Sequence, residues 1–279
     1  MTVIAVTGAT GQLGRLAVAA LKTRGAQPIA LVRSPEKAAD LGVEARAFDY
    51  TAVDAAALKG VDVLVLISSN DFNDRAGQHI NVLKAAKAAG VGRVIYTSLL
   101  KGDASPMILA ADHVATEKAI ADLGLTATIL RNGWYVENYA GSILGGPQHG
   151  AIMAASGAGK IAAESRADYA EAIAMTAVDA AHAGKVYELA GDDAFTMAEL
   201  SAEVAKQSGK PVAFHNLPQA DYAKALVGFG LPEGFAMVLA DSDAQAEQGA
   251  LYDGSKNLSA LIGRPTTPMA KAVAAVLAG

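Results

Sequence analysis

Three glycines spaced three residues apart follow the first apolar run of the chain, and this feature constrains the fold most. Val3–Val6 is strand-like, the sequence from Thr7 reads TGATGQLG, and an amphipathic helical pattern follows. Gly8 permits a tight turn, Gly11 lets backbone N–H groups approach a pyrophosphate, and Gly14 lets the helix pack closely on the strand. The order of strand, turn and helix predicts a dinucleotide-binding turn, with a purely structural glycine turn as the alternative.

The beginning of the first helix is the expected phosphate site. The N–H groups of a first helical turn have no intrahelical partner, and the positive end of the helix dipole lies beside them. We therefore expect a bound dinucleotide to contact the turn at Gly8, Thr10, Gly11, Gln12 and Leu13.

Arg33 indicates which dinucleotide binds. In folds of this type an acidic residue after the second strand holds the ribose 2′-hydroxyl of NAD. Here the second expected strand ends in Leu31-Val32-Arg33, without a carboxylate. Because a guanidinium binds a phosphate through two parallel hydrogen bonds, Arg33 favours NADP over NAD. The alternative is a surface arginine beside Glu36.

The N-terminal half alternates strand-like and helix-like segments. Strands are expected over residues 3–6, 28–32, 44–48, 61–67, 94–97 and 126–130, and helices over 13–21, 78–89 and 111–123. This alternation predicts βαβ units, and therefore an α/β fold with a Rossmann-type doubly wound parallel sheet. Ligands of such sheets bind beyond the carboxyl ends of the strands.

The C-terminal half is less regular. Tyr187–Leu189 is strand-like, Thr196 and Glu199 form a capping box that begins a helix, and Pro211–Leu217 indicates loops or edges. We expect an NADP-binding domain over residues 1–140, to which elements of about residues 165–190 return. A smaller α/β substrate lobe is expected over about residues 140–279.

Composition excludes several classes of function. The chain has no cysteine, which excludes disulfides and thiolate chemistry and suits a cytoplasmic protein. The formal charge is −5, whereas nucleic-acid binders typically carry a basic surface, so this class is not expected. No apolar run reaches the roughly 20 residues of a membrane helix, the start is unlike a secretion signal, and the histidines lack zinc-site spacing. The oligomeric state stays open, with a homodimer as one option.

Further motifs carry a resemblance over nearly the whole chain. They are residues 7–13, 67–69, 78–81, 85–91, 96–100, 131–138, 166–170, 187–191, 206–210 and 261–263. With these motifs the chain resembles the NmrA-like branch of the atypical short-chain dehydrogenases/reductases, and within it the bacterial NAD(P)H:quinone oxidoreductases of type 2. The resemblance implies an enzyme that binds NADPH and transfers hydride directly to a quinone or a similar electrophilic aromatic, without flavin or metal.

The resemblance also implies a set of cofactor contacts. It places Ser68 and Ser69 against the ribose and phosphates, and it lines the cofactor with Gly133, Trp134, Tyr135, Glu137, Asn138 and Arg166. Other members of the branch leave two alternatives open. One is a reductase of triphenylmethane or azo dyes, and the other is a non-catalytic regulator that senses NADP(H).

The tyrosine–lysine pair of ordinary short-chain dehydrogenases is missing from its expected place. That place reads His113-x-x-x-Glu117-Lys118, and the one match, Tyr252-x-x-x-Lys256, lies far beyond the fifth strand. A quinone accepts hydride with little proton help, so the absence fits the quinone interpretation. His113 is the catalytic candidate, as a hydrogen-bond donor or general acid. Its alternative is a surface histidine paired with Glu117.

Three aromatic residues are candidates for substrate contact. Trp134 and Tyr135 follow a strand end, and Phe72 lies on the loop after Ser68 and Ser69. A planar quinone can pack on such rings. The alternative for each is ordinary packing within the fold.

Overall fold

The structure, a computed structural model, describes residues 2–278 and divides them into two compact units. The first unit takes in residues up to 102, then 111–132 and 166–188. The second takes in residues 103–110, 133–165 and the chain from 189 onward. Each unit is described by itself.

A seven-stranded sheet in the order β3-β2-β1-β4-β5-β6-β8 forms the centre of the first unit. Its strands are β1 (Ile4–Thr7), β2 (Ile29–Val32), β3 (Ala45–Ala47), β4 (Val63–Leu66), β5 (Arg93–Leu99), β6 (Ala127–Asn132) and β8 (Val186–Leu189). Neighbouring strands from β3 to β6 run parallel. The order reverses between β1 and β4, as in a doubly wound sheet, so the predicted fold class is confirmed.

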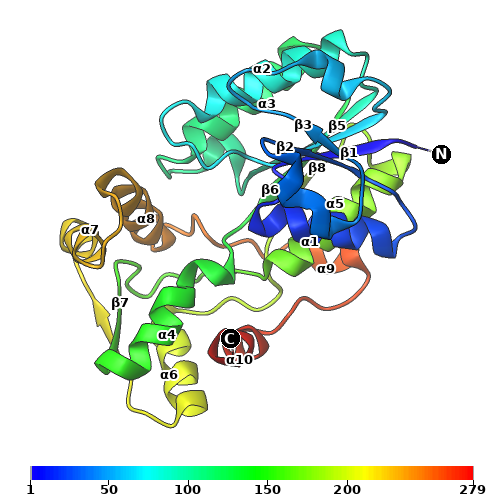
Figure 1. Cartoon of the computed structure of the whole chain (residues 1–279). Coiled ribbons are helices and arrows are strands. Elements are labelled where there is room, and N and C mark those ends of the chain that lie inside the picture. The colour runs from blue at the N-terminus through cyan, green and yellow to red at the C-terminus, as the bar shows by residue number, and fades with distance from the viewer. Residues whose placement is uncertain (1, 279) are drawn as a thin grey trace. The chain divides into compact units, whose positions relative to one another are not determined.

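Helices cover both faces of this sheet (Figure 1). The two helices α2 (Arg75–Ala88) and α3 (Ala110–Asp122) lie on one face, and α1 (Gln12–Thr23) packs against α5 (Arg166–Val178) on the other. Since both faces are covered, β4 is apolar and buried at every residue, as its sequence predicts. Short 3₁₀ helices fill the connections: η1 (Pro35–Leu41), η2 (Ala55–Leu58), η3 (Gly102–Ala104) and η5 (Ala180–His182).

The second unit is mainly helical around a small parallel pair, β7 (Ala151–Ala154) and β9 (Ala213–Asn216). Its helices are η4 (Val136–Tyr139), α4 (Ala140–His149), α6 (Met197–Ser208), α7 (Gln219–Gly228), α8 (Glu233–Ala246), α9 (Asn257–Ile262) and α10 (Met269–Ala278). The predicted capping box of α6 is confirmed, with Thr196 and Glu199 bonded to each other's backbone. Among residues 2–278, no helix is both long and apolar enough to cross a membrane.

The glycine turn between β1 and α1 takes the conformation that its sequence requires. Gly8 has a φ of +59°, in the left-handed region. A Cβ on Gly14 would lie 2.2 Å from the Gly8 carbonyl oxygen and 2.8 Å from the Ala9 Cα. The first turn of α1 therefore packs directly on the backbone of the glycine turn.

Replacing Gly14 with alanine should lower stability, because the backbone it would strike cannot swing aside. We expect a loss of about 1–3 kcal/mol, measured as the midpoint of urea unfolding. Gly141→Ala on α4 is the matched control, since its Cβ would meet nothing within 4 Å. That variant should be unchanged or slightly more stable. Equal effects of the two substitutions would contradict the close packing of Gly14.

Candidate functional site

The glycine turn leaves the beginning of α1 open to an anion. The helix starts at Gln12, and its N-cap is Gly11, which has no side chain to bond the N–H groups of the first turn. The Gly11 N–H closes the turn on the Gly8 carbonyl at 2.9 Å. Gly11 and Gln12 are exposed, Thr10 is half-buried and Leu13 is buried. The geometry fits a phosphate, which would bond the N–H groups that no side chain caps.

Arg33 follows β2 directly and is exposed. Its charge contributes to the lowered pKa of Asp49, although hydrogen bonds from the Thr51 N–H and hydroxyl lower that pKa more. Arg33 and Asp49 thus lie near one another beyond β2 and β3. Asp49 was not predicted from the sequence, although its place just after the third strand could have indicated it.

Arg15 joins the glycine turn to the segment after Arg33. Its Nε donates to the Thr10 carbonyl at 3.2 Å, and its guanidinium also bonds Asp40 and the Lys37 carbonyl on η1. The two stretches that would hold the pyrophosphate and the 2′-phosphate are therefore fixed to each other. This link too was missed, because nothing in the spacing of Arg15 indicates it.

The loop after β4 is held by side chains from three other elements. Three successive N–H groups donate: Ile67 to Thr7 Oγ1 at 3.0 Å, Ser68 to Thr97 Oγ1 at 2.8 Å, and Ser69 to His79 Nε2 at 2.9 Å. The Ser69 hydroxyl donates to Gln78 Oε1 at 2.7 Å and accepts the Asp71 N–H at 3.1 Å. Ser68 and Ser69 are both half-buried, and the backbone around them is ordered by these bonds.

Tyr50 locks the carboxyl ends of β1 and β4 together. Its hydroxyl lies 2.6 Å from Thr7 Oγ1 and 2.8 Å from the Ile67 carbonyl oxygen, and burial raises its pKa. A Cβ on Gly8 would lie 3.6 Å from that hydroxyl, so Tyr50 sits directly against the glycine turn. Tyr50, which follows the third strand by three residues, was not predicted as a site residue.

An ion-pair network occupies the carboxyl ends of β5, β6 and β8. Arg131 bonds both carboxylate oxygens of Glu117, at 3.0 and 2.7 Å, and one oxygen of Glu188 at 2.9 Å. Glu117 also accepts the Ser98 hydroxyl at 2.5 Å, and Glu188 accepts the Lys101 N–H at 2.7 Å. The network joins α3 to three strand ends. Glu117 stands where ordinary short-chain dehydrogenases have the catalytic lysine. Here its side chain holds the edge of the sheet instead.

His113 is buried beneath this region. Its Nδ1 lies 2.9 Å from the Tyr96 hydroxyl, and burial lowers its pKa to about 3, so the ring is neutral near neutral pH. The alternative of a surface histidine paired with Glu117 was wrong, since His113 is 5% exposed and Glu117 pairs with Arg131. A neutral, buried ring supports a structural role better than proton donation.

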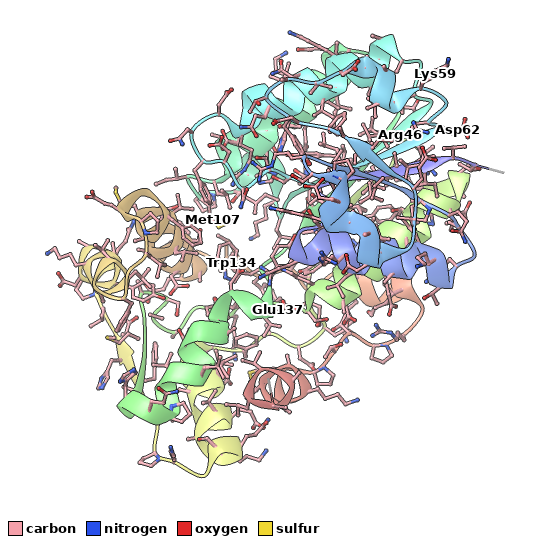
Figure 2. All side chains as sticks on the ribbon, in the orientation of Figure 1. Arg46, Lys59, Asp62, Met107, Trp134 and Glu137 are labelled. Carbon is pink, nitrogen blue, oxygen red and sulfur yellow. The ribbon has the colours of Figure 1, made fainter. Side chains whose placement is uncertain are left out.

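The segment after β6 belongs to the second unit; residues 133–135 are extended, and η4 begins at Val136. The Gly133 N–H donates to the Leu189 carbonyl at 2.7 Å, and Tyr135 pairs in parallel with Glu164. Trp134 is buried, Tyr135 and Glu137 are half-buried, and Asn138 is exposed. Figure 2 places Trp134 and Glu137 on the chain that leads into α4. The backbone pairing holds Gly133, Trp134 and Tyr135, and η4 carries Glu137 and Asn138.

The remaining candidates are scattered. Phe72 is 40% exposed, and the Arg75 guanidinium lies 4.6 Å from its ring centroid. Arg166 begins α5 in the first unit, where Asp168 is a buried first-turn carboxylate. Tyr252 is 46% exposed and belongs to the second unit. Within residues 2–278, no cluster of three or more histidine or acidic side chains is placed to hold a metal ion.

Comparison with known proteins identifies the family. The model of the NmrA-like family matches residues 1–268. The chain belongs to the NmrA-like family. It is 53% identical over 277 residues to quinone oxidoreductase 2 of Escherichia coli, with 97% of each chain covered.

Two solved structures resemble this NmrA-like protein closely. The NADPH complex of the NADPH-dependent quinone oxidoreductase QOR2 from Escherichia coli superimposes with a TM-score of 0.94 at 51% identity, over 98% of this chain and 99% of that one. The NADP(H) complex of triphenylmethane reductase from Citrobacter sp. has a TM-score of 0.91 at 34% identity, with 98% and 99% of the two chains covered. The family resemblance predicted from the sequence is confirmed.

The second unit also buries a carboxyl group that the sequence did not indicate. Asp243 on α8 is 3% exposed and accepts the Ala155 N–H at 3.3 Å. Burial raises its pKa to about 7, even though hydrogen bonds from Ala155 and Tyr139 lower it. Burial, and then the charge of Asp243, raise the pKa of Tyr139 and Tyr222. Asp243 is therefore largely protonated below neutral pH.

Asp243 should make the protein less stable as the pH rises from about 4 to about 7. The folded protein holds the Asp243 proton up to about pH 7, against an ordinary pKa of 3.8, so the unfolded chain releases it first over this range. Asp243→Asn should remove this loss. The stability of the variant minus that of the parent should therefore be greater at pH 8 than at pH 4, by on the order of 2–4 kcal/mol. Urea unfolding at both pH values measures it.

The exposed Asp221 on α7 provides the control. Its carboxylate pairs with Lys224 at 3.2 Å and is 56% exposed. Asp221→Asn should change stability by the same small amount at pH 4 and pH 8. A pH slope that survives in Asp243→Asn would show that another group carries it.

Proposed function

We propose that this protein is an NADPH-dependent reductase that transfers hydride directly to quinones, without flavin or metal. The observation that carries the proposal is the 53% identity to Escherichia coli quinone oxidoreductase 2 over 97% of both chains. The glycine turn with its uncapped helix and the arginine after β2 support it, because they offer partners for a pyrophosphate and a 2′-phosphate.

The proposed cofactor contacts begin with the strand ends of the first unit. In the first unit, N–H groups at Gln12 and Leu13 bind the pyrophosphate, which Gly11 allows to approach because it has no side chain. Arg33 binds the 2′-phosphate, and the loop of Ser68 and Ser69 contacts the ribose. Gly8 and Thr10 shape the turn. From the family resemblance the proposal also takes, as cofactor contacts, Arg166, Gly133, Trp134, Tyr135, Glu137 and Asn138. The pairing of Tyr135 with Glu164 orders the extended part of this segment.

The residues would act by positioning the two reactants. Bound NADPH supplies a hydride, and the quinone takes up that hydride and one proton to become the hydroquinone. Trp134, Tyr135 and Phe72 are the proposed aromatic contacts for the planar acceptor. Holding the acceptor ring against the nicotinamide converts an encounter in solution into a step within one complex.

The proton in this proposal comes from water. The pKa of His113 is lowered to about 3 by burial, so its imidazole carries no extra proton at neutral pH. Its 2.9 Å contact with the Tyr96 hydroxyl supports a structural role for His113 instead. A hydroquinone anion accepts a proton from water readily, so the reaction needs no buried acid.

A dye reductase is the second candidate function. It is favoured by the 34% identity and TM-score of 0.91 to the triphenylmethane reductase structure. Triphenylmethane dyes, like quinones, are flat electrophiles that accept hydride.

A cytoplasmic location and a homodimeric state belong to the proposal as well. Light scattering of the purified protein tests the homodimeric state.

Turnover by the flavin-free protein tests the proposed activity. Purified protein should oxidise NADPH with 1,4-benzoquinone under anaerobic conditions, with saturable kinetics well above a blank without protein. NADH should be used less well. Crystal violet in place of benzoquinone tests the dye reductase. Tight NADPH binding without turnover on any acceptor would instead indicate a regulator that senses NADP(H).

Loss of the Arg33 side chain should remove the preference for NADPH. A charge-assisted hydrogen bond to a phosphate contributes about 1.5–3 kcal/mol, so Arg33→Ala should raise KM for NADPH roughly 10- to 100-fold and leave KM for NADH unchanged. Arg24→Ala is the control, because Arg24 is exposed at the other end of α1. Equal KM changes for both cofactors would refute the 2′-phosphate assignment.

A further inference from the structure

His79 lies at the centre of a hydrogen-bonded line that runs from α3 to the loop after β4. The ring is fully buried on α2. Its Nε2 lies 2.9 Å from the Ser69 N, and its Nδ1 lies 2.9 Å from Thr116 Oγ1. Thr116 in turn donates its hydroxyl to the Asp112 carbonyl at 2.8 Å, one helical turn earlier on α3. All of these residues belong to the first unit.

The partners of His79 fix its tautomer. A threonine hydroxyl has one proton, and Thr116 gives it to the Asp112 carbonyl, so Thr116 accepts from His79. Nδ1 of His79 therefore carries the ring proton, which leaves a lone pair at Nε2 for the Ser69 N–H. Burial, with a smaller effect of the Arg75 charge, lowers the pKa of His79 to about 3. The ring is neutral and stays an acceptor throughout the working range of pH.

A second bond from α2 holds the other side of the same peptide stretch. The Arg75 Nε donates to the Ser69 carbonyl at 2.6 Å, and Arg75 is 4% exposed. Both backbone groups of Ser69 are thus bonded to side chains rather than to a neighbouring strand. The conformation of Ser69 depends on these two bonds, because the sheet ladder ends before it, at Leu66.

We propose that His79 is a positioning residue for cofactor binding, which sets the backbone of Ser68 and Ser69 through its Nε2 acceptor. The inference rests on the proposed function, in which this loop contacts the ribose of NADPH. His79 itself touches no cofactor. It acts through its hydrogen bond to the Ser69 N–H, which holds the loop in the conformation that contacts the ligand.

Two amide substitutions separate the two nitrogens of the ring. In His79→Gln the side-chain oxygen reaches the place of Nε2 and can accept the Ser69 N–H. In His79→Asn the shorter side chain reaches only the place of Nδ1, so the Thr116 bond is kept and the Ser69 bond is lost. The two variants differ by one methylene and carry the same functional group.

The experiment measures NADPH affinity by fluorescence titration, and kcat and KM with 1,4-benzoquinone. His79→Gln should keep the Kd and KM for NADPH within about threefold of the parent. His79→Asn should raise both at least tenfold, with kcat at saturation within threefold, because the loop contacts the cofactor away from the reacting ring. His182→Gln is the control; His182 bonds Tyr187 in the same unit and has no contact with the loop, so its values should not change.

Circular dichroism and thermal unfolding establish that each variant folds. If His79→Asn does not fold, Thr116→Val and Thr116→Ser replace it: valine removes the partner of Nδ1–H and should raise Kd, and serine should restore it. Equal values for His79→Gln and His79→Asn, or for the two Thr116 variants, would overturn the inference. If the parent protein binds NADPH but reduces no quinone, only the proposed activity is refuted. The Kd values of the variants still test the role of His79. A parent that binds no NADPH overturns both.

Discussion

The proposed binding edge, formed by the glycine turn after β1 and the loop after β4, depends on the hydroxyl of Thr7. It accepts the Ile67 N–H at 3.0 Å and lies 2.6 Å from the Tyr50 hydroxyl. It thereby joins the end of β1, where the glycine turn begins, to the loop after β4. Parallel strands leave the backbone groups beyond their ends without ladder partners, and buried N–H groups must be bonded. The side chains of Thr7, Thr97 and His79 supply those partners in succession.

This arrangement makes the proposed site a preformed one in the first unit. The glycine turn is closed by its own hydrogen bond and packed against α1, and Arg15 fixes it to η1. The ion pairs of Arg131 brace the ends of β5, β6 and β8. Because the backbone is ordered by the protein itself, less conformational entropy has to be lost when a dinucleotide binds.

The sequence predicts the first unit well because its elements follow local rules. An apolar run, a glycine turn and a helical pattern each depend on nearby residues, so the strands of the doubly wound sheet were found with ends shifted by a few residues. The second unit was predicted less well. The helices α4, α7, α8, α9 and α10 were missed. Glycine or proline interrupts or borders these patterns, as at Pro147 inside α4. The stretch 211–217, expected to be loop or edge, contains β9, which is the edge of a two-stranded sheet.

Within the proposed site, positions just after strands were found and their supports were not. Gly8, Arg33 and Ser68 follow strand ends, a rule that can be applied to a sequence. The contacts of Tyr50 with Thr7, of Arg15 with Lys37 and of His79 with Ser69 span 43, 22 and 10 positions, and no spacing in the sequence indicates them. His113 shows the converse, since its position in a helical pattern indicated a reactive or surface group and only the tertiary packing buries it.

Amide hydrogen exchange in the ligand-free protein tests most directly whether the binding edge is preformed. The amides of Ile67, Ser68 and Ser69 are bonded to buried side chains, so they should exchange far more slowly than an unstructured loop before any NADPH is added. Addition of NADPH should slow them by less than about threefold. If these amides exchange at unprotected rates in the free protein and become protected only with NADPH, the cofactor orders the loop, and the account of a preformed edge is wrong.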